Sequence, residues 1–251
     1  MRENLAVMPD RRKHRGPHPD DERLFGAAML PRLQCATDDL CWLLSREYAA
    51  ASSLKLVGDR YDLEQRQRTA ISRCACSDSA RRQRAARQVS IDSLAGQVLL
   101  IDGYNTLTTI EAALAGGFVL AARDGCYRDM ASVHGTWRRV EETTPAVELI
   151  GEFLAAGPDT ECRWYLDRPV SNSGRLKRIL LDVAVSRGWP WSVELVADPD
   201  PILAGASNPV ATADSAVLDR CGQWVNLAGE VVASSVPQAQ VIDLANSTGG
   251  R

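Results

Sequence analysis

The sequence predicts an α/β protein with a doubly wound, mostly parallel sheet, preceded by a small all-α region. Three observations carry this prediction. Short apolar runs alternate with helical patterns after about residue 96, residues 21–95 show helical apolar spacing, and the composition is 45% apolar and 24% charged. Alternating strands and helices are typical of a parallel sheet covered on both faces. The composition is usual for a globular protein.

The strands are predicted from short apolar runs that end in acids or turn residues. The first covers residues 98–101 and is followed by Asp102, Gly103, Tyr104 and Asn105. Such a run is typical of a fully buried parallel strand. Further strands are expected at residues 162–166, 193–196, 209–212 and 224–227, with helices at 108–115, 144–155, 173–187 and 214–221. Residues 118–121 fit either a strand or a helix.

The first part of the chain fits three helices and carries no catalytic motif. Residues 37–39 fit the cap of one helix, residues 62–64 fit the start of a second, and a third runs from about 78 to 88. Gly96 marks the expected domain boundary. We expect the following division: 1–20 a disordered basic tail, 21–95 a helical domain, 96–232 the α/β domain and 233–251 a C-terminal tail.

Charge and cysteine content limit the choice of partner and compartment. The net charge of −3 favours no partner, although eight arginines lie between residues 60 and 87. A solvated helix face is the first interpretation of that run, and contact with a polyanion is the alternative. Seven cysteines, an odd number, occur without a signal-peptide pattern or a long apolar segment. We therefore expect free thiols, a cytoplasmic location and no membrane association.

Acidic residues follow several of the predicted strands. Asp102 and Asp167 come directly after two of them, Asp198 and Asp200 follow a third, and Asp214 lies just beyond a fourth. Because the carboxyl ends of parallel strands lie at one edge of a sheet, these acids are expected to share one crevice. Mg²⁺ and Mn²⁺ prefer carboxylate oxygens, so a metal site is one interpretation. Turns and helix caps are the alternative for each acid.

Two stretches resemble a known nuclease family. Residues 98–105, VLLIDGYN, resemble the first strand and acid of the PIN-like nucleases, especially the NYN branch, and residues 211–215, ATADS, resemble their later Thr/Ser-x-Asp step. Residues 164–167 stand where those proteins often carry another strand-end acid. The resemblance covers roughly residues 96–232. The whole chain also resembles a bacterial and archaeal family of unknown function that joins a helical domain, with a stretch like residues 54–61, to a PIN-like domain.

The resemblance implies Mg²⁺- or Mn²⁺-dependent cleavage of RNA. Asp102, Asp167 and Asp214 would be metal ligands, and Asn105 would orient the first of them. The third acid of the family pattern has three competing counterparts, which are Asp198, Asp200 and Glu141. We include Asp200 in the expected metal set. The segment 116–142 is longer than the usual connection in that family.

Two polar clusters are candidate contacts for the phosphates of a substrate. One is rich in arginine and aromatic residues and spans residues 123–139, and the other follows Asp167 and opens a helix. Arginine pairs well with phosphate, and the start of a helix presents free N–H groups. Surface ion pairs and simple helix capping are the alternatives. The expected substrate-binding residues are Arg123, Arg128, Arg138, Arg168, Ser171, Asn172, Ser173 and Lys177.

The sequence therefore predicts a metal-dependent phosphodiesterase, in the first place a ribonuclease, whose helical part recruits RNA or a protein partner. One alternative is an inactive nucleic-acid-binding or scaffolding protein on the same fold. Another is a different phosphate-handling α/β enzyme. A haloacid-type phosphatase would need Asp-x-Asp after the first strand, where Tyr104 stands, and the Gly-x-Gly-x-x-Gly pattern of dinucleotide enzymes is absent.

Overall fold

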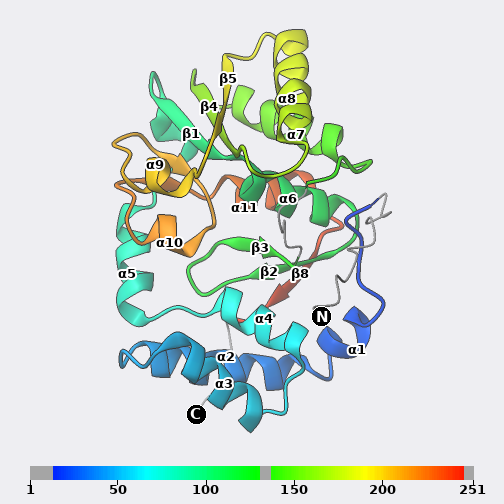
Figure 1. The fold of residues 1–251 in the computed structure, drawn as a ribbon, viewed down its shortest axis with the longest axis vertical. Coiled ribbons are helices and arrows are strands. Elements are labelled where there is room, and N and C mark those ends of the chain that lie inside the picture. The colour runs from blue at the N-terminus through cyan, green and yellow to red at the C-terminus, as the bar shows by residue number, and fades with distance from the viewer. Residues whose placement is uncertain (1–13, 131–136, 246–251) are drawn as a thin grey trace, which may run out of the picture.

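The computed structural model describes residues 14–130 and 137–245 of the chain, and the architecture is elongated, with its helices and strands arranged around two sheets (Figure 1). A five-stranded sheet with its helices forms one end and the N-terminal helices form the other, with a three-stranded sheet between them. The N-terminal helices are α1 (Asp21–Phe25), α2 (Leu30–Leu44), α3 (Ala50–Arg60), α4 (Gln65–Cys74), α5 (Asp78–Arg87) and the 3-10 helix η1 (Ile91–Leu94).

The five-stranded sheet is parallel throughout and has the order β5-β4-β1-β6-β7. Its strands are β1 (Val98–Asp102), β4 (Glu161–Asp167), β5 (Trp191–Val196), β6 (Val210–Ala211) and β7 (Trp224–Val225). The chain starts at the central β1, moves outward to β5, and then returns to the other side at β6. The strand order therefore reverses between β1 and β6, which is where doubly wound sheets form a crevice at their carboxyl ends.

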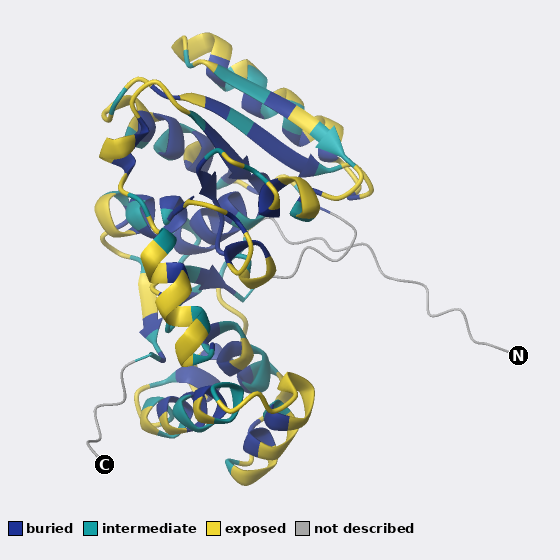
Figure 2. Cartoon of the chain, turned by 90° about the vertical axis from the view of Figure 1, so that its left-hand side faces the viewer, coloured by how far each residue is buried: buried dark blue, intermediate teal, exposed yellow. Residues whose placement is uncertain are grey.

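Helices cover both faces of this sheet. This is required because successive side chains of β1 point to opposite faces and are apolar on both. Leu99 and Ile101 pack against α6 (Gly103–Leu114), α7 (Thr143–Ala155), α8 (Ser173–Arg187) and α11 (Leu227–Ser235). Leu100 faces the opposite side, toward α9 (Asp200–Ala204) and α10 (Ser215–Leu218). The strands are accordingly mostly buried (Figure 2). These features confirm the predicted doubly wound α/β class.

A second sheet, not foreseen from the sequence, joins distant parts of the chain in the order β3-β2-β8. The strands are β2 (Phe118–Ala121), β3 (Tyr127–Asp129) and β8 (Gln240–Asp243); β2 pairs with β3 antiparallel and with β8 parallel. The expectation of a C-terminal tail from residue 233 is wrong up to residue 245. That segment completes α11 and adds β8, because Ile242 and Leu244 are buried against the N-terminal helices.

The N-terminal helices share a hydrophobic core with this second sheet. Leu33 and Ile71 of the helices pack in one cluster with Leu120 of β2 and Ile242 of β8. Residues 21–95 therefore pack closely against the part that follows the expected boundary near residue 96. Part of their apolar surface is buried against β2 and β8, and Figure 1 shows α4 directly against the second sheet.

Local signals for the helix starts were partly misleading. The expected cap at residues 37–39 is wrong, because α2 begins at Leu30 with a proline in its first turn and Thr37 donates to the carbonyl of Leu33 inside the helix. The start near residue 64 is confirmed. Glu64 and Gln67 form a capping box that opens α4.

Residues 14–20, expected to be part of a disordered tail, pack against the α/β part. Arg15 forms an ion pair with the fully buried carboxylate of Glu111, and His14 contacts Glu142 at 2.7 Å. Burial raises the pKa of Glu111, and the Arg15 guanidinium opposes that shift. A buried carboxylate needs such a partner, which accounts for the ordered segment. Residues 1–13 lie outside the described residues.

The arginine-rich run from residue 60 to 87 holds helices together more than it offers a free basic face. Five of its eight arginines form ion pairs: Arg60 with Asp39, Arg66 with Asp21, Arg68 with Asp59, Arg73 with Asp129 and Arg84 with Asp124. All seven cysteines are free thiols. Among the described helices, none is long and apolar enough to cross a membrane.

Candidate functional site

A cavity of about 490 Å³ lies at the carboxyl ends of β1, β4 and β6, where the strand order reverses. It is lined by all four acids of the expected metal set and by Asn105. These are Asp102, Asp167, Asp200 and Asp214. The structure therefore brings together residues that lie more than a hundred positions apart, as the parallel sheet predicted.

Asp102 ends β1 and is the most buried of the four acids. Asp102 is 8% exposed, and the Thr212 hydroxyl donates a hydrogen bond of 2.8 Å to Oδ2 of Asp102. Burial, together with the nearby charges of Asp214 and Asp200, raises the pKa of Asp102 to about 7. The ionised form is thus disfavoured in a site where several carboxylates lie close together.

The loop after β6 is fixed to the end of β1 by hydrogen bonds. The amide oxygen of Asn105 accepts from the backbone N–H of Ala213 at 3.0 Å, and the Thr212 hydroxyl accepts from the N–H of Asp214 at 3.0 Å. The expectation that Asn105 orients Asp102 is compatible with a contact through the Asn105 backbone. Its backbone N–H interacts with Asp102 and lowers that pKa, while its side chain holds the loop that carries Asp214.

Asp214 has a structural role in addition to its place in the cavity. Its Oδ1 accepts from the backbone N–H groups of Ala216 at 2.7 Å and Val217 at 3.2 Å, so it caps α10. The helix-cap alternative is therefore correct for this acid, and it coexists with a position on the cavity wall. The cap orients one oxygen toward the helix.

Asp167 and Asp200 interact with other acids of the same edge. Burial, and then the charge of Asp198, raise the pKa of Asp167. Burial, followed by Asp214, Asp198 and Asp167, raises the pKa of Asp200. Of the competing acids, Asp198 is exposed and accepts from the Asp200 N–H, and Glu141 lies beside His14 away from the cavity. Within the described residues, no three His, Cys, Asp or Glu side chains stand close enough to hold a metal ion.

Gly103 allows α6 to start against β4 directly after Asp102. A Cβ at this position would lie 2.9 Å from the carbonyl oxygen of Tyr165 and 2.4 Å from Cδ2 of Leu166. We expect Gly103→Ala to lower the free energy of unfolding by about 1–3 kcal/mol, because a backbone atom must shift to relieve the overlap. Urea unfolding measures this. Gly174→Ala is the control, since nothing lies within 4 Å of its added Cβ, and a comparable loss there would contradict the steric explanation.

Arg128 lines the cavity, but its guanidinium is already occupied. It forms two hydrogen bonds with Asp124, of 2.9 and 2.7 Å, and donates to the carbonyl of Ala213 at 2.8 Å. The guanidinium is therefore engaged within the protein, and its expected role in binding substrate stays a prediction. Arg128 instead positions the backbone of the loop that carries Asp214.

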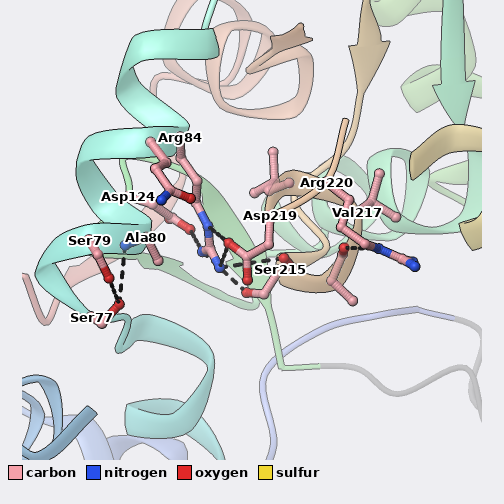
Figure 3. A network of polar contacts seen from close by, with 12 residues as sticks. Ser77, Ser79, Ala80, Arg84, Asp124, Ser215, Val217, Asp219 and Arg220 are labelled. Atoms are coloured by element: carbon pink, nitrogen blue, oxygen red, sulfur yellow. Dashed lines mark hydrogen bonds and ion pairs between the residues drawn. The ribbon is translucent and has the colours of Figure 1, made fainter. Parts of the chain in front are cut away.

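Asp124 is the centre of a buried ionic network that extends to α5 and α10. Arg84 donates to Asp124 and to Asp219, and its guanidinium also lies beside Ser215 (Figure 3). Burial opposes ionisation of Asp124, but Arg128 and Arg84 outweigh it and hold the pKa of Asp124 below its usual value. The sequence did not reveal this network, because its arginines come from segments more than forty residues apart.

The remaining expected substrate-binding residues do not line the cavity. Arg123 pairs with Asp78 and donates to the carbonyl of Cys76, so it fixes the connection between α4 and α5. Arg168 donates to the Leu195 carbonyl, Asn172 to the Trp137 carbonyl and Ser173 to the Arg168 carbonyl. The residues found away from the cavity are Arg123, Arg138, Arg168, Ser171, Asn172, Ser173 and Lys177. Residues 131–136 of the first cluster lie outside the described residues.

Several cavity residues were missed from the sequence. Arg73 of α4, Asp129 of β3 and the α6 residues Tyr104 and Thr108 all line the wall. The Tyr104 hydroxyl is buried and has no hydrogen-bond partner among the described residues, and burial and the charge of Asp167 raise its pKa. The spacing of Tyr104 and Thr108, one helical turn apart, is the signal that could have found that pair.

Comparisons with known proteins give family membership and no activity. Residues 91–230 match DUF5616, described as a domain of unknown function, and residues 32–87 match DUF434, described as a protein of unknown function. A protein of Methanocaldococcus jannaschii, described as uncharacterized, is 27% identical over 186 residues, which cover 74% of this chain and 88% of that protein. No solved structure matches. Because the DUF5616 match, residues 91–230, covers more than half of the chain, the chain belongs to the DUF5616 family.

Proposed function

We propose that this chain is a metal-dependent phosphodiesterase of the PIN-like type that cleaves RNA. The observation that carries the proposal is the gathering of four strand-end acids in one cavity, with the pKa of Asp102 raised to about 7 by burial and by its acidic neighbours. Crowded carboxylates of this kind are stabilised by a bound cation. The seven free thiols fit a reducing cytoplasm, which we propose as the site of this activity.

The donor set fits Mg²⁺ or Mn²⁺, because it consists of carboxylate oxygens and includes no soft ligand. Asp102, Asp167, Asp200 and Asp214 would hold the ion. When bound, the cation would supply positive charge to offset the charge that develops on the phosphodiester. Thr212 holds the Asp102 carboxylate, and Asn105 holds the loop of Asp214, so two acids from neighbouring strands keep a fixed register.

The direct test is cleavage of a labelled single-stranded RNA by the full chain. We expect cleavage with Mg²⁺ or Mn²⁺, none in EDTA, and a loss of at least about a hundredfold in Asp167→Asn, because one of the cation-holding acids is removed. Asp182→Asn, an exposed acid on α8, is the matched control and should cleave as the wild type does. Cleavage that persists in EDTA, or is equal in Asp167→Asn and the wild type, contradicts the proposal.

One observation favours a second candidate, a nucleic-acid-binding or scaffolding protein without catalysis. No three acids of the described residues stand together as metal ligands in the present arrangement. In that case RNA binds equally well in EDTA, the affinity falls steeply with salt, and no cleavage occurs with either ion. The same RNA and buffers therefore separate the two candidates.

A further inference from the structure

One residue of the cavity wall has a buried hydroxyl without a hydrogen-bond partner. Of the side chains that line the cavity within residues 14–130 and 137–245, only Tyr104 has such a buried and unpartnered polar atom. The residue is 6% exposed. A buried hydroxyl that makes no hydrogen bond costs free energy, and a ligand that supplies the partner removes that cost. The Tyr104 hydroxyl is therefore a position at which a ligand group would complete the hydrogen bonding.

The neighbouring hydroxyls on α6 are already engaged. Thr108 donates to the backbone carbonyl of Tyr104 at 2.8 Å, and Thr109 donates to that of Asn105 at 3.1 Å. Both threonine hydroxyls also lie 3.1 Å from the carboxylate of Asp129. The lack of a partner is thus particular to Tyr104 and is not a general property of this wall.

The start of α6 places Tyr104 close to the end of β4. Asp102 pairs in register with Tyr165 of β4, and a Cβ on Gly103 would lie 2.9 Å from the Tyr165 carbonyl oxygen. Asp167, which ends β4, lines the cavity together with Tyr104. Burial and then the charge of Asp167 raise the pKa of Tyr104, which agrees with this position. The phenol therefore keeps its proton at neutral pH and can donate it to a ligand.

A phenol donor and a carboxylate acceptor on one side of a cavity suit a particular ligand group. An ionised carboxylate can only accept hydrogen bonds. A phosphate oxygen also only accepts, so it can meet Tyr104 but is repelled by the charge of Asp167. An alcohol hydroxyl fits both, because its oxygen accepts from Tyr104 while its hydrogen is donated to Asp167. In single-stranded RNA that group is the 2′-hydroxyl of ribose, which DNA lacks.

We propose that Tyr104 and Asp167 together bind the 2′-hydroxyl of one ribose and thereby select RNA over DNA. The Asp167 carboxylate has two oxygens, so one can face the cation while the other accepts from the hydroxyl. A site built to hydrogen-bond a hydroxyl rejects an analogue without it, because the polar groups of the site then stay unpaired. This inference rests on the proposed function for the class of substrate, and it adds the group by which the two nucleic acids are distinguished.

The test compares the binding of two strands and does not depend on cleavage. A short fluorescent single-stranded RNA of adenine and cytosine, and the DNA of the same sequence, are titrated in Mg²⁺ with the full chain carrying Asp102→Asn. Anisotropy gives both affinities. We expect this parent to bind the RNA about tenfold more tightly than the DNA. With Tyr104→Phe added, the preference should fall to about twofold or less, through weaker binding of RNA and unchanged binding of DNA. Differences in flexibility between the strands act on both proteins and cancel.

Tyr165→Phe, added to the same parent, is the matched control. Tyr165 is also 6% exposed, but it packs in the core on the other face of the sheet and does not line the cavity. Its preference for RNA should stay within about twofold of that of the parent. Thermal unfolding without nucleic acid tests a purely structural role. Tyr104→Phe should unfold at the same or a higher temperature than the parent, because it loses an unpartnered hydroxyl. A lower unfolding temperature with an unchanged preference for RNA would overturn the proposal.

Three other results would overturn the assignment. The first is an equal preference for RNA in the parent and in Tyr104→Phe, or a parent that binds both strands equally or neither. The second is an equal fall in RNA and DNA affinity in Tyr104→Phe, which would mean that Tyr104 meets a group common to both strands. The third concerns 2′-fluoro RNA, which has no hydrogen to donate to Asp167: binding as tight as that of RNA removes Asp167 from the proposal. Absence of cleavage by the wild type, with a Tyr104-dependent preference for RNA, contradicts only the proposed function.

Discussion

Replacing Asp102 by asparagine is expected to reduce metal-dependent RNA cleavage on the order of a thousandfold while making the metal-free protein more stable at neutral pH. Asp102 ends the central strand, it is the most buried of the four acids, and its charge interacts with those of Asp214 and Asp200. Asparagine keeps the size and can still accept the hydrogen bond from Thr212. The loss of activity would therefore come from the lost charge and not from a collapsed site.

The gain in stability follows from the raised pKa of Asp102. That pKa is about 7 in the folded chain and about 3.9 in an unfolded one. Below pH 4 both states hold the proton, so the stabilising effect is fully present. Between about pH 4 and 7 the folded state keeps a proton that the unfolded state has lost, so stability falls as the pH rises, by about 4 kcal/mol at most. The asparagine side chain of the variant cannot ionise and avoids this loss.

Urea unfolding in EDTA between pH 4 and 8 measures the difference between the two proteins. The curves should coincide at pH 4 and separate toward pH 8, with the Asp102→Asn variant the more stable. Added Mg²⁺ should recover stability in the wild type and have a smaller effect in the variant, because binding to the folded state alone stabilises it. Asp182→Asn should follow the wild type throughout. Identical pH profiles for wild type and Asp102→Asn would show that ionisation of Asp102 does not destabilise the fold.

The sequence was most informative where one local pattern predicts both a strand and the acid that ends it. The run at residues 98–101 and the run at residues 162–166 became β1 and β4 with small changes at their ends, and the helix expected at 173–187 is α8. A fully buried strand must be apolar along its length, so the acid that ends it is visible without a structure. This is why the four acids could be placed at one edge in advance.

The sequence was least informative where the structure depends on distant pairing. Strand β2 pairs with β8, which lies more than a hundred residues later in the chain. Each strand is only four residues long, so neither has a sequence pattern that identifies the strand with which it pairs. The same limit applies to charge. The sequence shows Arg128 as an arginine that could bind substrate, but it does not show that Arg128, on β3, shares the carboxylate of Asp124 with Arg84 of α5.

Asp124 is that shared carboxylate, and its replacement by asparagine is expected to lower the free energy of unfolding by about 3–5 kcal/mol. The side chain is 1% exposed and forms ion pairs with Arg84, which is 3% exposed, and with Arg128, which is 10% exposed. Asparagine keeps the shape but removes the buried negative charge that both arginines share, so two guanidinium groups remain buried with less compensation. Thermal and urea unfolding measure the loss.

Asp219→Asn is the matched control for this prediction. Asp219 contacts the same arginine, Arg84, at 2.7 Å, but its side chain is 46% exposed, so water can replace most of what it provides. We expect a change of less than about 1 kcal/mol there. Equal effects of the two substitutions would mean that burial does not set the strength of this network, and that Asp124 has no special role.

Asp124→Asn is expected to affect the cavity as well as the stability of the fold. Arg128 donates to the carbonyl of Ala213, one residue before Asp214, and Arg84 lies beside Ser215, one residue after it. Loss of Asp124 frees both arginines from their fixed positions, so the loop that carries Asp214 should loosen even where the protein is still folded. At a temperature well below its unfolding transition, the variant should therefore cleave RNA more slowly than Asp219→Asn does. Full cleavage by a folded Asp124→Asn variant would show that the loop is held by Asn105 and Thr212 alone.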